Sequence, residues 1–141
     1  MRTLGLDVGE RRIGVAISDP EERLAVPLRV LERRGGDADA RAIAELARRE
    51  GVGRIVVGLP VSLNGTLGRQ ARQTQAFVER LRAATDAEVV LYDERLSTAE
   101  ADRHLRQLGM REREMRSRRD AVAAAIILQA YLDSRRAAAD S

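Results

Sequence analysis

Three acidic residues stand where the surrounding sequence otherwise predicts buried structure. Asp7 ends the first apolar segment, Glu94 follows the apolar segment 88–92, and Asp120 opens an apolar stretch near the C-terminus. Side chains at strand ends and helix starts can converge at one edge of a sheet, where α/β proteins usually build their sites. Converging carboxylates repel one another unless a cation neutralises them. The three acids are therefore candidate ligands of a cation.

The residue types also indicate which cation this would be and what it could do. Oxygen-only ligation favours hard ions such as Mg²⁺ or Mn²⁺. A single His and the absence of Cys argue against zinc. Two hard ions roughly 3.5–4 Å apart can activate a water and stabilise the leaving oxygen of a phosphodiester. We therefore expect Asp7, Glu94 and Asp120 to bind Mg²⁺ or Mn²⁺ and to cut a phosphodiester bond.

Each acid also has a purely structural interpretation, which the sequence leaves open. Asp7 could form a turn with the glycine that follows. Glu94 could pair with Arg95, and Asp120 could lie in the first turn of a helix, where the helix dipole favours an acid. Asp93 is the weaker candidate for the site, because adjacent residues of a strand point to opposite faces.

A second group of residues could contact the phosphates of a nucleic acid. Its arginines can bind a phosphate through two N–H groups, and its remaining members stand in turns that could present backbone amides. The group consists of Gly9, Arg12, Asn64, Gly65, Arg95, Arg116, Arg118 and Arg119. The alternative is ordinary turn formation and surface ion pairs, such as Arg12 with Glu10 or Asp19.

The segment 110–119 holds five Arg and two Glu directly before Asp120. It could form a basic flap over a substrate, and each phosphate it neutralised would steepen the salt dependence of binding. A solvated charged loop is the alternative. The only histidine, His104, is expected to be structural. Ser97 with Glu100 fits a capping box, so we expect Ser97 and Thr98 mainly to cap a helix.

The bulk composition favours one domain over residues 1–141. Hydrophobic residues make up 44% of the chain, enough for a core, but aromatic residues only 2%, too few for a platform that stacks single-stranded bases. The net charge of +3 is compatible with nucleic acid. We see no signal peptide and no apolar run of the roughly 20 residues that a membrane span needs, so we expect a cytoplasmic protein without a membrane partner.

The apolar periodicity predicts five strands and four helices, and hence one mixed sheet flanked by helices on both faces. Pro27 places the third strand at an edge, because proline lacks an N–H donor. The last helix is apolar almost all round and should be deeply packed, with fraying at about 137–141. The expected strands cover 3–8, 13–18, 24–31, 54–57 and 88–92, and the expected helices about 37–51, 69–84, 97–109 and 119–136.

Four segments, in order along nearly the whole chain, resemble the YqgF-type pre-16S rRNA nuclease family, also described as Holliday-junction-resolvase-like. The first matches the family pattern D-x-G-x-x-R-x-G-x-A at Asp7, Gly9, Arg12, Gly14 and Ala16. The segments are LGLDVGERRIGVAISD, IVVGLPVSLNGTLG, LYDERLSTAEA and RRDAVAAAIILQAYLD. Two departures are Glu10, where the family often has Thr or Ser, and Arg where Lys is common before Asp120.

The resemblance implies an RNase-H-like fold and a divalent-metal triad of Asp7, Glu94 and Asp120. It also implies cytoplasmic processing of the 5′ end of the 16S rRNA precursor. A structure-selective DNA nuclease, such as a junction resolvase, and a non-catalytic nucleic-acid-binding factor in transcription or ribosome assembly remain alternatives. We expect a monomer or a weak homodimer; symmetric cutting of two strands would call for a two-fold dimer.

Overall fold

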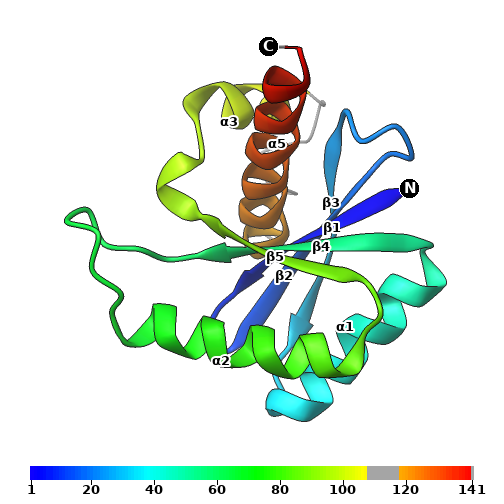
Figure 1. The fold of residues 1–141 in the computed structure, drawn as a ribbon, viewed down its shortest axis with the longest axis vertical. Helices are drawn as coiled ribbons and strands as arrows, with labels where there is room; N and C mark the ends of the chain where they lie inside the picture. The colour runs from blue at the N-terminus through cyan, green and yellow to red at the C-terminus, as the bar shows by residue number, and fades with distance from the viewer. Residues whose placement is uncertain (108–117, 141) are drawn as a thin grey trace.

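The computed structural model, which describes residues 1–107 and 118–140, contains a single five-stranded sheet with helices on both faces (Figure 1). In chain order the elements are β1 (Arg2–Val8), β2 (Arg12–Ser18), β3 (Ala25–Glu32), α1 (Gly36–Arg49), β4 (Val52–Leu59), α2 (Arg69–Ala84), β5 (Glu88–Asp93), the short 3-10 helix η1 (Glu94–Leu96), α3 (Ala99–Arg106) and α5 (Arg119–Ala139). The mixed sheet flanked by helices is the architecture that the sequence predicts.

The order of the strands brings three strand ends to one edge of the sheet. The order is β3-β2-β1-β4-β5. β1 pairs antiparallel with β2 in a hairpin, and β1, β4 and β5 run parallel. The carboxyl ends of these three parallel strands therefore lie together. β3, which contains Pro27, is an edge strand as expected.

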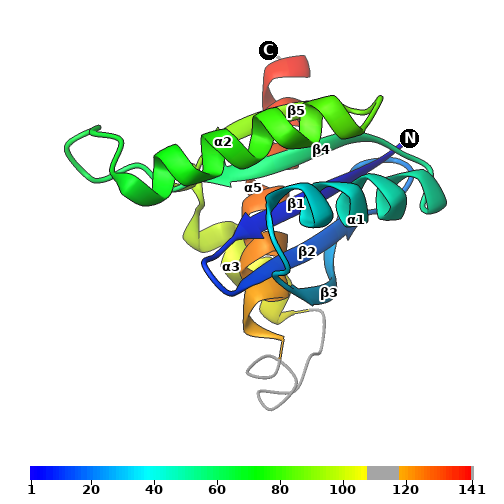
Figure 2. The ribbon, with the colours of Figure 1, turned by 90° about the horizontal axis from the view of Figure 1, so that it is seen from below.

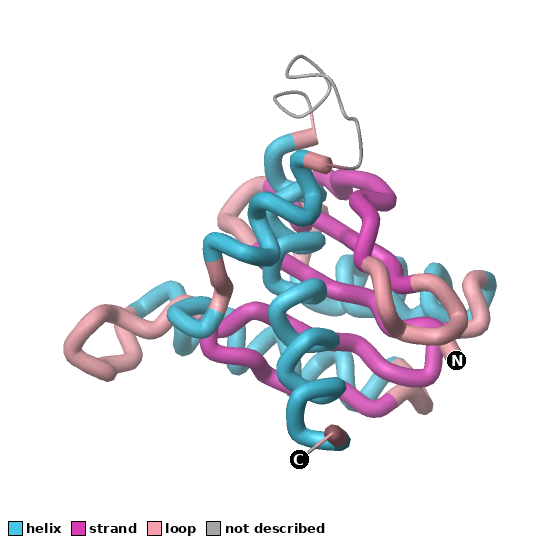
Figure 3. Tube along the Cα trace, turned by 90° about the horizontal axis from the view of Figure 1, so that it is seen from above, coloured by secondary structure: helices cyan, strands magenta, loops and turns pink. Residues whose placement is uncertain are grey.

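The alternation of side chains along the strands separates two cores. Leu4, Leu6 and Val8 of β1 pack with α1 and α2 on one face, which lies toward the viewer in Figure 2. The intervening residues face α5 on the other side, which lies in front of the strands in Figure 3. There Leu128 of α5 packs with Val56 of β4. Each fully buried leucine contributes roughly 1.5–3 kcal/mol, so α5 is held firmly against the face that also bears Asp7.

Some element boundaries differ from the expectation. β4 extends beyond the predicted strand 54–57 at both ends: Val52 pairs with Arg2 of β1 across an irregularity at Gly53, and Gly58 and Leu59 continue the pairing with β5. α5 continues to Ala139, past the predicted end at Arg136. α3 begins at Ala99 and ends at Arg106, and the predicted helix end at Gly109 lies outside the described residues. Within 1–107 and 118–140, none of the helices is long and apolar enough to cross a membrane.

Candidate acidic active site

Asp7 lies on the face of the sheet that α5 covers, close to the start of that helix. Across the hairpin it pairs with Gly14 of β2. A Cβ atom at Gly14 would lie 1.8 Å from the carbonyl oxygen of Asp120. Only a glycine therefore lets the backbone of Asp120 rest on β2 at this point. Gly14 brings the third predicted acid beside the first.

Glu94 reaches the same place from the far side of β4. β5 ends at Asp93, and the carboxylate of Asp93 accepts a hydrogen bond from the backbone N–H of Arg95 at 2.9 Å, which caps η1. Gly58 of β4 leaves room for the Glu94 side chain: a Cβ at Gly58 would lie 2.9 Å from Glu94 Oε1. The side chain can therefore pass over β4 toward β1.

The carboxyl groups of Asp7 and Glu94 lie close enough to form a hydrogen bond with each other. Burial raises the pKa of Glu94 to about 7, and the charge of Asp7, this hydrogen bond and the charge of Asp93 act in the same direction. Burial and the charge of Asp120 raise the pKa of Asp7, although the hydrogen bond from Glu94 opposes the rise. Two carboxyl groups can be bonded in this way only if they hold a proton between them.

A pocket of about 240 Å³ opens at this pair of acids. Asp7, Glu94 and Ser97 form its polar part, and Ala123, Ile126 and Ile127 of α5 form an apolar wall. Hollows of about 420 and 660 Å³ lie elsewhere on the molecule. The small pocket is the candidate site because its carboxyl groups converge and repel, and such perturbed groups are typical of functional sites.

Ser97 is a pocket residue that the sequence analysis assigned to another role. The expected capping box with Glu100 is wrong by one residue, because Thr98 caps α3: its Oγ1 accepts a hydrogen bond from Ala101 N at 3.0 Å. Ser97 is thereby released from the helix and lines the acid pocket. A cap one residue later looks the same in the sequence, since Ser and Thr both serve as caps.

The donor set of this pocket suits a hard divalent cation. All three acids offer carboxylate oxygens, the ligands that Mg²⁺ and Mn²⁺ prefer. A cation would relieve the repulsion that raises the pKa values of Asp7 and Glu94. Among the described residues, no group of three or more His, Cys, Asp or Glu side chains is already arranged as ligands of one ion. Asp120 would have to turn toward the other two acids.

The expected phosphate-binding residues near Glu94 are tied to their neighbours. Arg95 pairs with Asp93, with Nη2 2.7 Å from Oδ2. The alternative interpretation of Glu94, as the partner of Arg95 in an ion pair, is therefore wrong. The backbone N–H of Gly65 donates to Ser62 O at 2.8 Å, and Asn64 accepts bonds within the same loop. The N–H of Gly65 is therefore already used within the loop, which argues against its donating to a phosphate. Asn64 takes part only as an acceptor in these bonds, so its expected contact with a phosphate stays a prediction.

At the hairpin turn beside Asp7, Arg12 forms an exposed pair with Glu32 at 3.5 Å, not with Glu10 or Asp19. Asp19 instead accepts hydrogen bonds from backbone N–H groups of its own turn. Gly9 donates its N–H to Arg12 O at 2.9 Å, as a turn residue would.

The sequence analysis missed Arg33, whose Nη1 donates to the carbonyl oxygen of Gly9 at 2.9 Å. Its Nε also donates to Asp39 at 3.1 Å, and its guanidinium lies over the Phe77 ring, 5.5 Å from the centroid. Arg33 therefore braces the turn that follows Asp7. Nothing in the sequence pattern around residue 33 distinguishes it from the other arginines.

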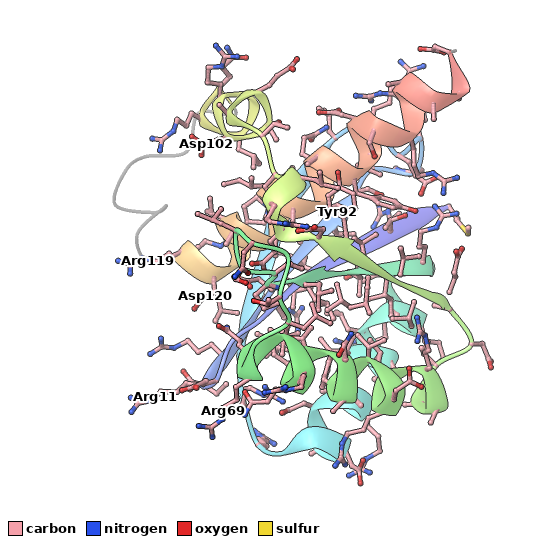
Figure 4. All side chains as sticks on the ribbon, turned by 60° about the vertical axis from the view of Figure 1, so that its left-hand side comes forward. Arg11, Arg69, Tyr92, Asp102, Arg119 and Asp120 are labelled. Atoms are coloured by element: carbon pink, nitrogen blue, oxygen red, sulfur yellow. The ribbon has the colours of Figure 1, made fainter. Side chains whose placement is uncertain are left out.

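Of the remaining expected phosphate ligands, Arg118 and Arg119 lie at the start of α5. Figure 4 places Arg119 at the same end of the molecule as Asp120, Arg11 and Arg69, where the parallel strands end. Arg116 lies outside the described residues, as does most of the arginine-rich segment. His104 belongs to α3, but its side chain is outside the described part, so its structural role stays a prediction.

Known proteins match this chain along almost its whole length. The RuvX family, described as Holliday junction resolvase, matches residues 1–134. A protein of Anaeromyxobacter sp. (strain Fw109-5), named a candidate pre-16S rRNA nuclease, is 50% identical over 137 residues, 97% of this chain and 100% of the relative. A protein of the same name from Chloroflexus aggregans is 48% identical over 133 residues and covers 94% of each chain.

The fold also has a counterpart among solved structures. RuvC of Thermus thermophilus superposes with a TM-score of 0.65 over 97% of each chain, at 16% sequence identity. At that identity the likeness concerns the fold, which is RNase-H-like, as the resemblance implied. Because the family match and the two relatives span both ends of the sheet and α5, the chain belongs to the RuvX family of YqgF-type proteins.

Proposed function

We propose that this protein is a divalent-metal-dependent nuclease that hydrolyses phosphodiester bonds, with Asp7, Glu94 and Asp120 as its catalytic and metal-binding residues. One observation carries the proposal: Asp7 and Glu94 converge in one pocket, close enough to form a hydrogen bond, and the charge of Asp120 acts on Asp7. Such an arrangement costs stability, and it is useful where a cation binds. The names of the relatives agree with this activity.

In this mechanism the chain's own residues prepare the site. Asp7, Glu94 and Asp120 would hold Mg²⁺ or Mn²⁺, which when bound would activate a water and stabilise the charge on the leaving oxygen. Asp7 and Glu94 would give up their shared proton to become ligands. The apolar wall of α5 would exclude water and strengthen the electrostatic interactions. Arg118 and Arg119 would hold the flanking phosphates.

We propose the 16S rRNA precursor as the substrate, cut in the course of forming its 5′ end in the cytoplasm. The support is the shared name of relatives at 48–50% identity that span this chain almost completely. A net charge of +3 without any lysine is compatible with a polyanionic substrate. Arginine suits this task because its planar group binds phosphate through two N–H donors.

Branched DNA is a second candidate substrate, favoured by the description of the RuvX family as Holliday junction resolvase. The same three acids would cut either substrate, so the acids do not distinguish the two candidates. The oligomeric state that each substrate requires does. Symmetric cutting of a four-way junction requires a two-fold dimer. Sedimentation with and without a four-way junction would separate the candidates: a protein that stays monomeric with the junction would not be a symmetric resolvase.

The deciding experiment compares cleavage by wild type with Asp7→Asn, Glu94→Gln and Asp120→Asn, each in Mg²⁺, in Mn²⁺ and in EDTA. Substrates are a 16S precursor fragment and a four-way DNA junction. Asp37→Asn is the matched control, because Asp37 is an exposed acid at the start of α1 that pairs with Arg80. Full activity of Asp7→Asn would eliminate the proposed site.

The same variants separate catalysis from a purely binding role in the cell. If the protein is a nuclease, cells that carry only Asp7→Asn protein should accumulate 16S precursors with extended 5′ ends. If it is a non-catalytic factor, end-mapping of the precursors should give the same 5′ ends as in wild type.

A further inference from the structure

The loop that joins β4 to α2, residues 60–68, carries an almost wholly exposed leucine. Leu63 is 95% exposed, whereas the other large exposed hydrophobic residues in 1–107 and 118–140 lie between 39% and 63%. The loop projects from the body of the protein at the left of Figures 1 and 2. Exposed leucines as such are common. What distinguishes Leu63 is the way the loop holds it.

The loop is built around a network of hydrogen bonds from both sides of Leu63. Asn64 Oδ1 accepts from Ser62 Oγ at 2.7 Å, from Thr66 N at 3.1 Å and from Thr66 Oγ1 at 2.7 Å. Gly65 N donates to Ser62 O, and Gly65 has φ +85°, which favours glycine. The tip is therefore an ordered turn that presents one apolar side chain to solvent.

This loop is attached to the acidic site by one arginine. Arg95 Nη1 lies 3.5 Å from Ser62 O, while its Nε and Nη2 are held by Asp93. Arg95 directly follows Glu94, and the strand that leads into the loop passes under Glu94 at Gly58. The loop and the acid pocket thus share both a strand and a bridging side chain.

The surroundings of the loop are basic, which suits nucleic acid. Arg95 is exposed beside it, and Arg69 and Arg72 are exposed at the start of α2, where the loop ends. Figure 4 places Arg69 at the same end of the molecule as Asp120 and Arg119. A partner that covers this end must therefore carry negative charge and must also accept an apolar side chain.

Stacked bases flanked by phosphates meet both requirements. Proteins insert leucine and similar apolar side chains between base steps as wedges, which unstack the step and kink the duplex. We infer that Leu63 is such a wedge: it enters a base step beside the phosphate that is cut, so the preferred substrate is a duplex at a helix end or junction, where a step opens easily. This inference rests on the proposed nuclease function.

The stem end of a folded RNA and the branch point of a DNA junction share this chemistry, so both are used in the test. Each carries 2-aminopurine, whose fluorescence rises when its base is unstacked, at the step nearest the junction. Binding is followed by anisotropy with Asp7→Asn protein, which should bind without cutting. If Leu63 is a wedge, the fluorescence should rise when Asp7→Asn protein binds. The rise should be absent with the double variant Asp7→Asn/Leu63→Ala and present again with Asp7→Asn/Leu63→Met.

Affinity should change far less than fluorescence, by no more than about threefold, because the phosphate contacts are retained. Leu24→Ala is the matched control, since Leu24 is an exposed leucine in the turn before β3 and should leave the signal intact. In the otherwise wild-type protein, Leu63→Ala should slow cleavage of the duplex junction by about tenfold or more, and should spare an unpaired strand.

The outcomes separate this inference from the proposed function. If Leu63→Ala leaves both binding and fluorescence unchanged, the wedge is overturned and the nuclease proposal stands. Failure to bind either nucleic acid would overturn both. A change in sedimentation on Leu63→Ala, with no change in fluorescence, would show that the leucine contacts a second protein copy and would likewise overturn the wedge.

Discussion

Gly14 pairs directly with Asp7 across the β1–β2 hairpin, and it is the point at which the first turn of α5 rests on the sheet. The side chain that is missing at Gly14 leaves the space that the carbonyl of Asp120 occupies. The distance between the first and the third acid therefore depends on a residue that has no chemistry of its own.

The first prediction tests this packing. Gly14→Ala should push the start of α5 away from β2, lower the free energy of unfolding by about 1–3 kcal/mol and reduce cleavage further than the loss of stability explains. Gly68→Ala is the control, because nothing lies within 4 Å of a Cβ at Gly68. Urea denaturation and cleavage rates measure the two effects; normal cleavage by Gly14→Ala would contradict the argument.

The second prediction concerns the brace on the turn after Asp7. Arg33→Met keeps much of the length of the side chain but removes the bonds to Gly9 O and Asp39. A displaced Asp7 should lower kcat by roughly 10- to 100-fold with little change in KM. Arg34→Met is the control. Arg34 is the next residue along the chain, its side chain is exposed, and the bond to Gly9 O comes from Arg33. An equal loss in both variants would point to charge instead of position.

The third prediction is a dependence of stability on pH through Asp39. Burial acts to raise the pKa of Asp39, but hydrogen bonds from Arg34 N, Arg33 and Gly35 N, with the charge of Arg33, leave it below the ordinary 3.8. The unfolded chain therefore binds the proton more readily than the folded chain does. This contribution to stability is present above about pH 4 and is lost as the pH falls through the lower folded pKa.

Asp39→Ala should accordingly lower the free energy of unfolding at pH 7 by about 3 kcal/mol, because it leaves Arg33 without its buried partner. The difference from wild type should shrink as the pH falls below about 4. Asp37→Ala serves as the control because Asp37 is largely exposed. Thermal melts from acidic to neutral pH measure the difference; a constant difference across this range would refute the linkage.

The fourth prediction concerns the cation. Above pH 7 the charge of Glu94 is unfavourable in the pocket, so Glu94→Gln should raise the melting temperature of the metal-free protein. Mn²⁺ should stabilise the wild type, by about 2.7 kcal/mol at about 100 times its Kd, and should have much less effect on Glu94→Gln. Calorimetry in EDTA and in Mn²⁺ measures both changes. Equal stabilisation of the two proteins would place the ion elsewhere.

The fifth prediction concerns phosphate binding at the start of α5. If Arg119 neutralises one phosphate of duplex DNA, Arg119→Ala should reduce the slope of log K against log salt concentration by about 0.9. Arg41→Ala on α1 is the control, since Arg41 lines a hollow near Ala84 and Ala87 whose lining includes none of the three proposed catalytic acids. Titrations at several salt concentrations measure the slope, and an unchanged slope would remove Arg119 from the interface.

The sequence by itself determined the secondary structure and the candidate acids. Periods of two and 3.6 in the apolar residues define strands and helices locally, so the five strands, the edge position of β3 and the deep packing of α5 could all be predicted. Asp7, Glu94 and Asp120 stood out because an acid in an apolar context is costly. The resemblance to the YqgF-type family added the fold, which is the one observed.

Only the tertiary structure decided which groups meet. The closeness of Asp120 to Asp7, the passage of Glu94 over Gly58 and the brace from Arg33 to Gly9 all join segments far apart along the chain. Contacts of this kind depend on how closely helices and strands pack, which a missing Cβ can change by ångströms, whereas the local pattern of apolar residues stays the same. For that reason the sequence could name the acids but not the glycines that bring them together.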